Sequence, residues 1–295
     1  MYALISRSGD PTPRVERIDP PLLSPGEVRV TVAAAGFTLY DAVAAADHGL
    51  LGLPDVVGLG FDFAGTVIET GDDVKEFAAG DRVAGLHGGV TSKSRAHASE
   101  VVVPVDALAA VPEGLALEGA AAVTLSALAA RQALDLLGDE RGSLLVTGGA
   151  GGVGGWAVSL GTRDGWTVDA LVRPGTEHLA LAAGAVATPA DPPPGSYDAV
   201  IDAADLQGTA LAAVRDGGRY IGFKPGRPLE TERGIIATAV LTKPDGQSLA
   251  GLLALAADGL APVRIAATRP LSEAAGLYTA ALAAPGSDGR WLLLP

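Results

Sequence analysis

The sequence contains no cysteine, and this absence narrows the chemistry open to the chain. Without thiols it has no disulfide, no thiol nucleophile and no zinc site built on a thiolate. The four histidines, His48, His87, His97 and His178, follow no metal-ligand spacing. We therefore expect no metal in this protein.

Basic charge and long apolar runs are also scarce. Lys and Arg number 21 against 34 Asp and Glu, which gives a net charge of -13 and a pI near 4.6. Nucleic acids and anionic membrane surfaces would repel such a chain, so we expect neither as a partner. The uncharged window 142–162 has too many glycines for a membrane span, and the N-terminus lacks the apolar core of a signal peptide. We expect a cytoplasmic protein.

Glycine is abundant, and one glycine-rich stretch organises the rest of the chain. Residues 144–160, LLVTGGAGGVGGWAVSL, read as a short apolar strand, a turn and a helix. Gly149, Gly151 and Gly154 have the G-x-G-x-x-G spacing, which suits a tight turn, close approach to a pyrophosphate and close packing of helix on strand. The helix N-terminus then offers N–H groups to phosphates. The pattern predicts a dinucleotide site, with a glycine-rich connection as the alternative, and its loop comprises Gly149, Ala150, Gly151, Gly152, Val153 and Gly154.

The pattern of apolar residues and turns predicts two domains in an α/β protein. Short strand candidates separated by Gly and Pro turns indicate a partly open β-barrel in the first part, at 1–6, 27–33, 63–68, 82–86 and 100–104. A helical pattern over 117–137 then leads into alternating strands and helices, which predict a parallel doubly wound sheet, with strands at 144–147, 167–172, 199–202 and 219–223. The segment 235–241 is a candidate for an added strand. We predict one domain from 1–115 with 262–295 and a second from 116–261.

Five stretches spread over nearly the full length carry a family resemblance. They are GEVRVTVAAAGF (26–37), GFDFAGTVIETGDDVKEFAAGDRVAGL (60–86), VVVPVDALAAVPEGLALEGAAAV (101–123), VTGGAGGVGG (146–155) and the closing DGRWLLLP. With them the chain resembles the medium-chain dehydrogenase/reductase superfamily, in its zinc-free quinone oxidoreductase and enoyl reductase branch. The resemblance implies a GroES-like β-barrel catalytic domain joined to a Rossmann domain, an active site in the cleft between them, and a homodimer formed through edge strands near 235–241.

The chain departs from its family in the turn after the second strand. Zinc enzymes of the family place a cysteine where this chain has Thr38, and a histidine before a glutamate where it has Phe61 and Asp62. Quinone reductases of the branch commonly have an asparagine-proline pair followed by an aspartate. Here the turn reads TLYD (38–41), which keeps the aspartate, Asp41, and loses the asparagine. The substrate and the proton donor therefore stay open at this point.

The choice of cofactor rests on the charge after the second strand of the nucleotide-binding domain. Arg173 follows that strand, and Thr176 and His178 come shortly after it, so these three could surround a 2′-phosphate. Asp169 is the rival, because an acidic residue there would bind the ribose hydroxyls of NAD. Three apolar residues follow Asp169 before the turn, which places it within the strand. We therefore predict NADPH.

Further site residues follow from the resemblance and from local chemistry. Tyr40 is the first candidate proton donor, with Asp41 and His48 as catalytic neighbours. Their alternatives are a packed aromatic, a turn cap and a loop residue. His97 takes a position where the family often has an aromatic side chain beside the substrate cleft. Additional candidates for cofactor binding are Thr124, Ser126, Phe223 and Lys224, of which the first two could be helix caps and Lys224 a solvated charge.

The predicted reaction follows from the missing metal ligands. Hydride transfer to a simple carbonyl places charge on oxygen, which a zinc ion would hold, whereas conjugated acceptors delocalise that charge. We predict an NADPH-dependent, zinc-independent oxidoreductase that reduces a conjugated carbonyl, a quinone or an enone. The alternatives are an enoyl-thioester or biosynthetic tailoring reductase, and a non-redox NADPH-binding protein that acts as a sensor or a scaffold-type catalyst.

Overall fold

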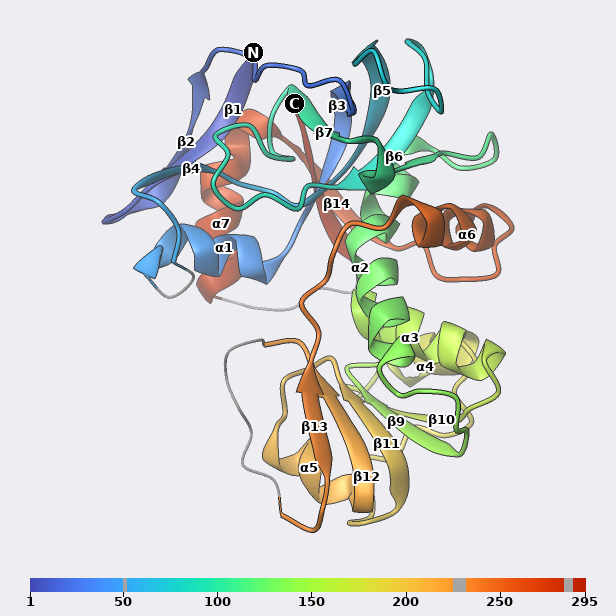
Figure 1. The fold of residues 1–295 in the computed structure, drawn as a ribbon. Helices are drawn as coiled ribbons and strands as arrows, with labels where there is room; N and C mark the ends of the chain where they lie inside the picture. Colours follow the sequence, from blue (N-terminus) through green and yellow to red (C-terminus); the bar gives the residue numbers. More distant parts are fainter. Residues whose placement is uncertain (50–51, 225–231, 284–288) are drawn as a thin grey trace. The chain divides into compact units, whose positions relative to one another are not determined.

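The computed structural model describes residues 1–49, 52–224, 232–283 and 289–295. The chain splits into two compact units (Figure 1). Unit 1 comprises Met1–Leu125, Lys243–Asp258 and Val263–Pro295, and unit 2 comprises Ser126–Thr242 and Gly259–Pro262. Helix α2 (Leu117–Asp135) crosses from unit 1 to unit 2.

Unit 1 is β-rich. Over its described residues it holds a seven-stranded sheet of order β14-β15-β3-β5-β6-β8, with β7 paired to β3, and a three-stranded sheet of order β2-β1-β4. The first sheet contains β3 (Glu27–Phe37), β5 (Asp62–Thr70), β6 (Arg82–Leu86), β7 (Glu100–Pro104), β8 (Leu108–Ala110), β14 (Ile265–Pro270) and β15 (Arg290–Leu294). The second contains β1 (Tyr2–Arg7), β2 (Asp10–Arg17) and β4 (Val56–Gly58).

The alternation seen in the sequence sets the face of β3. Val28, Val30 and Val32 all point into the core of unit 1, where they pack with Phe63 of β5. Alternate residues of a strand point to opposite faces, so this pattern requires one buried and one more exposed face. An irregularity between Val32 and Ala34 breaks the register with β5. Beyond it the strand is buried on both faces through Phe37, where the turn to α1 begins.

The C-terminal segment completes unit 1. Strand β15 pairs antiparallel with β3, at Trp291 opposite Phe37. Helix α7 (Ala274–Ala283) lies beside α1 (Leu39–Ala46) (Figure 1), and Tyr278 of α7 shares a buried cluster with Phe37 and Ala42. Helix α6 (Gly246–Ala257), which falls within the predicted 116–261 domain, also packs in unit 1, against β8.

Unit 2 contains the predicted parallel sheet. Within its described residues the order is β10-β9-β11-β12-β13, and every neighbouring pair is parallel. The strands are β9 (Ser143–Thr147), β10 (Thr167–Leu171), β11 (Tyr197–Asp202), β12 (Val214–Gly222) and β13 (Ile236–Ala239). The helices after the first three are α3 (Gly152–Arg163), α4 (Glu177–Ala182) and α5 (Gly208–Ala213). The fold class is thus confirmed, and α5, between the third and fourth strands, is an addition to the predicted helices.

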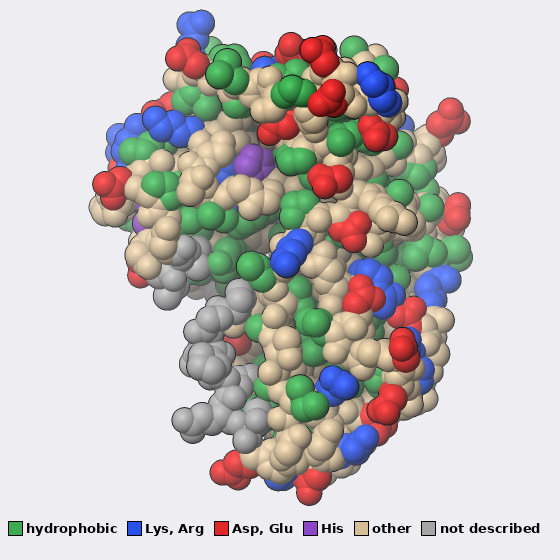
Figure 2. All heavy atoms as spheres, in the orientation of Figure 1, with side chains coloured by type: hydrophobic (Ala, Val, Ile, Leu, Met, Phe, Trp, Pro, Cys, Tyr) green, Lys and Arg blue, Asp and Glu red, His purple; other side chains and the backbone are tan. Residues whose placement is uncertain are grey.

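The surface reflects the charge balance of the sequence. Asp and Glu side chains are distributed over much of the face shown in Figure 2, interspersed with Lys and Arg. No helix in the described part of the chain is both long and apolar enough to cross a membrane.

Candidate functional site

The glycine loop joins β9 to α3 in a turn that only glycine tolerates. Gly148 has a φ of +63°, in the left-handed region. A Cβ on Gly149 would lie 2.6 Å from the Cβ of Ala170, and one on Gly154 would lie 2.1 Å from the carbonyl oxygen of Gly148. No side chain of the described residues caps α3 at its N-cap, Gly151. Helix N-termini present N–H groups that can bind an anion, and α3 begins directly after the glycine turn, which fits a bound pyrophosphate.

Two of the three predicted phosphate-binding residues share a turn beside this loop, and the third follows in α4. The N–H of Gly149 donates to the carbonyl of Leu171, the last residue of β10, at 3.3 Å. Two residues later Arg173 opens a turn in which its carbonyl accepts from the N–H and the hydroxyl of Thr176, at 3.1 and 2.7 Å. The side chains of Arg173 and His178 are exposed. Arg173 and Thr176 thus share a turn that follows the strand end beside the glycine loop, and His178 lies in the helix that begins there.

Two carboxylates lie close in sequence to the turn that contains Arg173 and Thr176. Glu177 stands at the start of α4, where backbone N–H groups lower the pKa of its carboxyl, so an acidic group adjoins the cationic turn. Asp169, the rival for cofactor choice, lies inside β10 and accepts a hydrogen bond from the Tyr197 hydroxyl at 2.8 Å. Burial and this bond raise the pKa of Tyr197. The Asp169 carboxylate is therefore held by a neighbouring strand and stands back from the strand tip.

A buried network that the sequence did not reveal organises the next loop. Asp202 ends β11 and is 2% exposed. Its carboxylate accepts from the hydroxyls of Thr147 and Tyr220, at 2.5 and 2.7 Å, and from the N–H groups of Leu206 and Gln207, at 3.0 and 2.8 Å. The loop from 203 to 207 is therefore fixed beside the glycine loop. The feature of the sequence that could have indicated this network is an aspartate, Asp202, at the end of a predicted strand.

Phe223 and Lys224 follow the carboxyl end of β12, as predicted from the sheet. Phe223 is half-buried. The ammonium of Lys224 contacts the carboxylate of Asp205, and the Lys224 side chain is 57% exposed. An ion pair this exposed contributes little stability. Its geometric effect is to place the Lys224 charge over the loop that Asp202 anchors.

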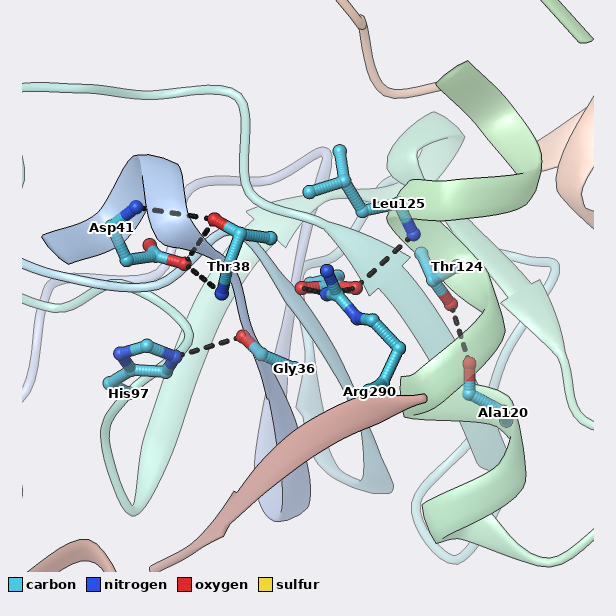
Figure 3. A network of polar contacts seen from close by, with 9 residues as sticks. Gly36, Thr38, Asp41, His97, Ala120, Thr124, Leu125 and Arg290 are labelled. Carbon is cyan, nitrogen blue, oxygen red and sulfur yellow. Dashed lines mark hydrogen bonds and ion pairs between the residues drawn. The ribbon is translucent and has the colours of Figure 1, made fainter. Parts of the chain in front are cut away.

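In unit 1 the turn after β3 is a helix cap. Thr38 is the N-cap of α1 and forms a capping box with Asp41 (Figure 3). One oxygen of Asp41, Oδ2, accepts from the Thr38 N–H and hydroxyl at 2.8 and 2.7 Å. The other, Oδ1, is buried and has no hydrogen-bond partner among the described residues. Asp41 therefore has the helix-capping role that was its alternative, and its Oδ1 takes no part in the cap.

Tyr40 is the exposed member of this turn. Its side chain is 41% exposed, and its ring lies 5.7 Å from the ring of Phe61. Partial burial raises the pKa of Tyr40; the positive charge of Arg95 lowers it and the negative charge of Asp41 raises it. Tyr40 is thus partly exposed, and the charges of Arg95 and Asp41 act on its hydroxyl.

Two of the candidate histidines brace the fold. His48 is buried, and its ring nitrogens contact the Ser6 hydroxyl and the Pro54 carbonyl, each at 2.8 Å. His97 is fully buried, and its Nε2 donates to the Gly36 carbonyl at 2.9 Å (Figure 3). Its Nδ1 contacts the Tyr278 hydroxyl at 2.7 Å. Burial lowers the pKa of His97. Because both nitrogens of each ring are engaged, the geometry favours structural roles for these two residues.

Asp62, at the glutamate position of the zinc enzymes, forms a buried ion pair. Its carboxylate accepts from Arg290 of β15 at 2.5 and 2.8 Å and from the N–H of Leu125 in α2 at 3.2 Å. Burial raises the pKa of Asp62 against the opposing effect of Arg290. The neighbouring Thr124 hydroxyl donates to the Ala120 carbonyl within α2 at 2.9 Å (Figure 3), and Ser126 is buried in the same helix. In the described ranges no three His, Asp or Glu side chains lie close enough to hold a metal ion.

Comparison with known proteins shows which domains and enzymes the chain is similar to. The GroES-like domain of alcohol dehydrogenases matches residues 24–130. The chain is 40% identical over 185 residues to erythronolide synthase EryA2 of Saccharopolyspora erythraea, which covers 62% of this chain and 5% of the synthase. It is 36% identical over 148 residues to a quinone oxidoreductase of Pseudomonas aeruginosa, which covers 47% of this chain and 43% of that protein. These matches therefore span less than half the length of either relative.

Solved structures extend the likeness to the whole fold. The quinone oxidoreductase of Coxiella burnetii aligns with 100% of this chain and 99% of its own, at a TM-score of 0.87 and 24% identity. An alcohol dehydrogenase superfamily protein of Novosphingobium aromaticivorans aligns with 100% of this chain and 99% of its own, at a TM-score of 0.86 and 24% identity. The GroES-like match over residues 24–130 and the parallel sheet with its glycine loop support the resemblance to the medium-chain dehydrogenase/reductase superfamily.

Proposed function

We propose that the protein is an NADPH-dependent, zinc-independent reductase of a conjugated carbonyl, a quinone or an enone. The observation that carries the proposal is the glycine loop, where Gly149 and Gly154 allow a close backbone turn directly before the N-terminus of α3, a place where helix N–H groups can bind a pyrophosphate. The nicotinamide, when bound, supplies the hydride. What this chain contributes is binding, orientation and the control of charge and protons.

The preference for NADPH rests on the turn after β10. Arg173 and Thr176 lie in one turn after the strand end that Gly149 contacts, and His178 follows in the first turn of α4. A guanidinium can bind a 2′-phosphate with two parallel hydrogen bonds. Asp169, which NAD would require at the strand tip, is held within the strand by Tyr197. Lys224 and Phe223, at the end of β12, complete the proposed cofactor-binding set with Thr124 and Ser126 of α2.

Tyr40 is the proposed proton donor. Among the three predicted catalytic residues it alone has a side chain that is substantially exposed, at 41%. Asp41 holds the start of α1 through Thr38 and so sets the position of Tyr40. His48 braces the Ser6 strand and the Pro54 carbonyl, so we leave it out of the catalytic set. The substrate is a small molecule, and the homodimer through strands near 235–241 remains a proposal.

The first test is binding. The protein is titrated with NADPH and with NADH, followed by cofactor fluorescence, and the titrations are repeated with Arg173→Ala. We expect Arg173→Ala to weaken NADPH binding about 10- to 100-fold, as for loss of a charge-assisted hydrogen bond, and to leave NADH binding unchanged. Arg215→Ala is the matched control, because Arg215 is an arginine of the same unit near the amino end of β12. Equal wild-type affinity for the two cofactors would refute the charge argument.

The second test is turnover with a panel of quinones and enones. The competing tailoring reductase is favoured by the 40% identity to erythronolide synthase EryA2, and it predicts faster oxidation of NADPH by a crotonyl thioester than by any quinone. Tight NADPH binding with no oxidation by any acceptor would support the non-redox alternative instead.

A further inference from the structure

Arg95 is a buried cation that folding alone does not explain. It is 1% exposed and lies in the segment between β6 and β7. Its guanidinium carbon is 4.2 Å from the centroid of the Phe61 ring, and its Nη1 reaches the Gly58 carbonyl at 3.4 Å. Nε and Nη2 are buried without a hydrogen-bond partner among the described residues. Buried groups of this kind are costly, so native proteins keep few of them without a functional reason.

The charge of Arg95 is directed at the turn after β3. The Phe61 ring contacts both the Arg95 guanidinium and the Tyr40 ring, so Phe61 links the cation to the tyrosine. Tyr40 and Asp41 are among the groups whose charges act on Arg95, together with Tyr278 of α7. His87, which follows β6, is neutral near neutral pH because burial and the charge of Arg95 lower its pKa to about 4.

Asp41 does not neutralise this cation directly. Its Oδ2 is taken up by Thr38, its Oδ1 has no hydrogen-bond partner in the described part of the chain, and the two side chains form no direct ion pair there. A charge that is fixed, poorly hydrated and not directly paired exerts a strong field on its neighbours. Of the two charged groups that act on Tyr40, Arg95 favours its ionised form and Asp41 opposes it.

We propose that Arg95 is a positioning residue of the reduction, whose buried charge stabilises the phenolate that Tyr40 becomes when it gives up its proton. The inference rests on the proposed function. The nicotinamide, when bound, would supply a hydride to the β-carbon of the enone, which would leave the electrons of the C=C bond on the carbonyl oxygen as an enolate. The Tyr40 O–H bond then breaks, its proton joins the α-carbon through the enolate electron pair, and the phenolate takes a proton from water. Arg95 stays protonated throughout.

The test compares Arg95→Met, which removes the charge and keeps the length of the side chain, with Arg95→Lys, which keeps the charge. Ionisation of Tyr40 is measured by tyrosinate absorbance as the difference between each protein and the same protein carrying Tyr40→Phe. We expect the pKa of Tyr40 to rise in Arg95→Met and to return toward the wild-type value in Arg95→Lys. Should Arg95→Met fail to fold, Arg95→Gln, which keeps an N–H donor for Gly58, takes its place.

Kinetics supply the second readout. Loss of the charge should lower kcat about tenfold, a part of the 10²- to 10⁴-fold that general acid catalysis contributes, and should move the basic limb of the pH profile to higher pH. The KM for NADPH should stay unchanged. An unaltered Tyr40 titration in Arg95→Met would overturn the proposal, even if stability or kcat falls. The titration needs neither cofactor nor substrate, so a wild-type protein without turnover would refute the proposed function and leave the Arg95 effect measurable.

Discussion

The carboxylate of Asp202 should be the main anchor of the loop beside the glycine turn, and Asp202→Asn tests this. Each oxygen of the Asp202 carboxylate accepts two hydrogen bonds. Oδ1 accepts from Thr147 and Leu206, and Oδ2 accepts from Tyr220 and Gln207. Two residues of the loop have positive φ, Asp205 at 56° and Gln207 at 44°, a strain that its anchoring must offset. The substitution changes one oxygen to an amino group and leaves the shape almost unaltered.

The magnitude follows from the number of donors left facing that amino group. An amide nitrogen accepts no hydrogen bond, so two of the four donors lose their acceptor in either orientation of the asparagine. Hydrogen bonds to a charged group contribute about 1.5–3 kcal/mol each, which predicts a loss of about 3–6 kcal/mol in the free energy of unfolding of unit 2. Tyr220→Phe is the graded control, because it removes one of the four bonds and should cost at most half as much.

Equilibrium unfolding in urea, followed by tryptophan fluorescence, measures this loss. Trp156 and Trp166 are buried in unit 2, whereas Trp291 belongs to unit 1, so a Trp291→Phe background makes the signal specific to unit 2. NADPH binding should also weaken, because Ala204 of the anchored loop lies against Gly148 and donates its N–H to Thr147. If the free energy of unfolding of Asp202→Asn lies within about 0.5 kcal/mol of the wild-type value, a range typical of surface substitutions, the carboxylate is not the anchor of the loop.

Three further predictions concern the pH dependence of stability, the glycine turn and the buried ion pair. Burial lowers the pKa of His87 from 6.5 to about 4 in the folded protein. Between these two pH values the unfolded chain carries a proton on His87 that the folded protein does not bind. The free energy of unfolding should therefore fall by up to about 3 kcal/mol as the pH drops from 6.5 through 4. His87→Gln should flatten that slope in urea unfolding measured against pH, and an unchanged slope would contradict the assignment. Gly154→Ala should abolish NADPH binding through its clash with the Gly148 carbonyl, whereas Gly251→Ala, in open space on α6, should raise stability by about 0.5–1 kcal/mol. Asp62→Asn should cost about 3–5 kcal/mol by thermal unfolding, since it leaves the Arg290 charge buried without its partner, and Glu16→Gln in the exposed pair with Arg7 less than about 1 kcal/mol. Equal effects of the last two would refute the role given to burial.

The sequence by itself determined the fold class and the glycine turn, because both depend on neighbouring residues. Alternation of Val28, Val30 and Val32 predicted a strand with one buried face, and those three side chains are buried. The spacing of Gly149, Gly151 and Gly154 predicted a strand, turn and helix, since a Cβ at two of those positions would meet other atoms in any such turn. Local periodicity and steric exclusion are properties that a chain carries before it folds.

Only the tertiary structure decided which polar side chains brace the fold and which stay open for chemistry. His97 meets Tyr278 across 181 residues, and Asp62 meets Arg290 across 228, so nothing near either residue in the sequence indicated its partner. Arg95 was not among the residues singled out from the sequence, and its guanidinium lies over the ring of Phe61 in the fold. Asp202 stood only at the end of a predicted strand, and in the fold four donors converge on its carboxylate. Burial and hydrogen-bond partners arise from contacts between distant segments, and these contacts set the charge state and the role of each group.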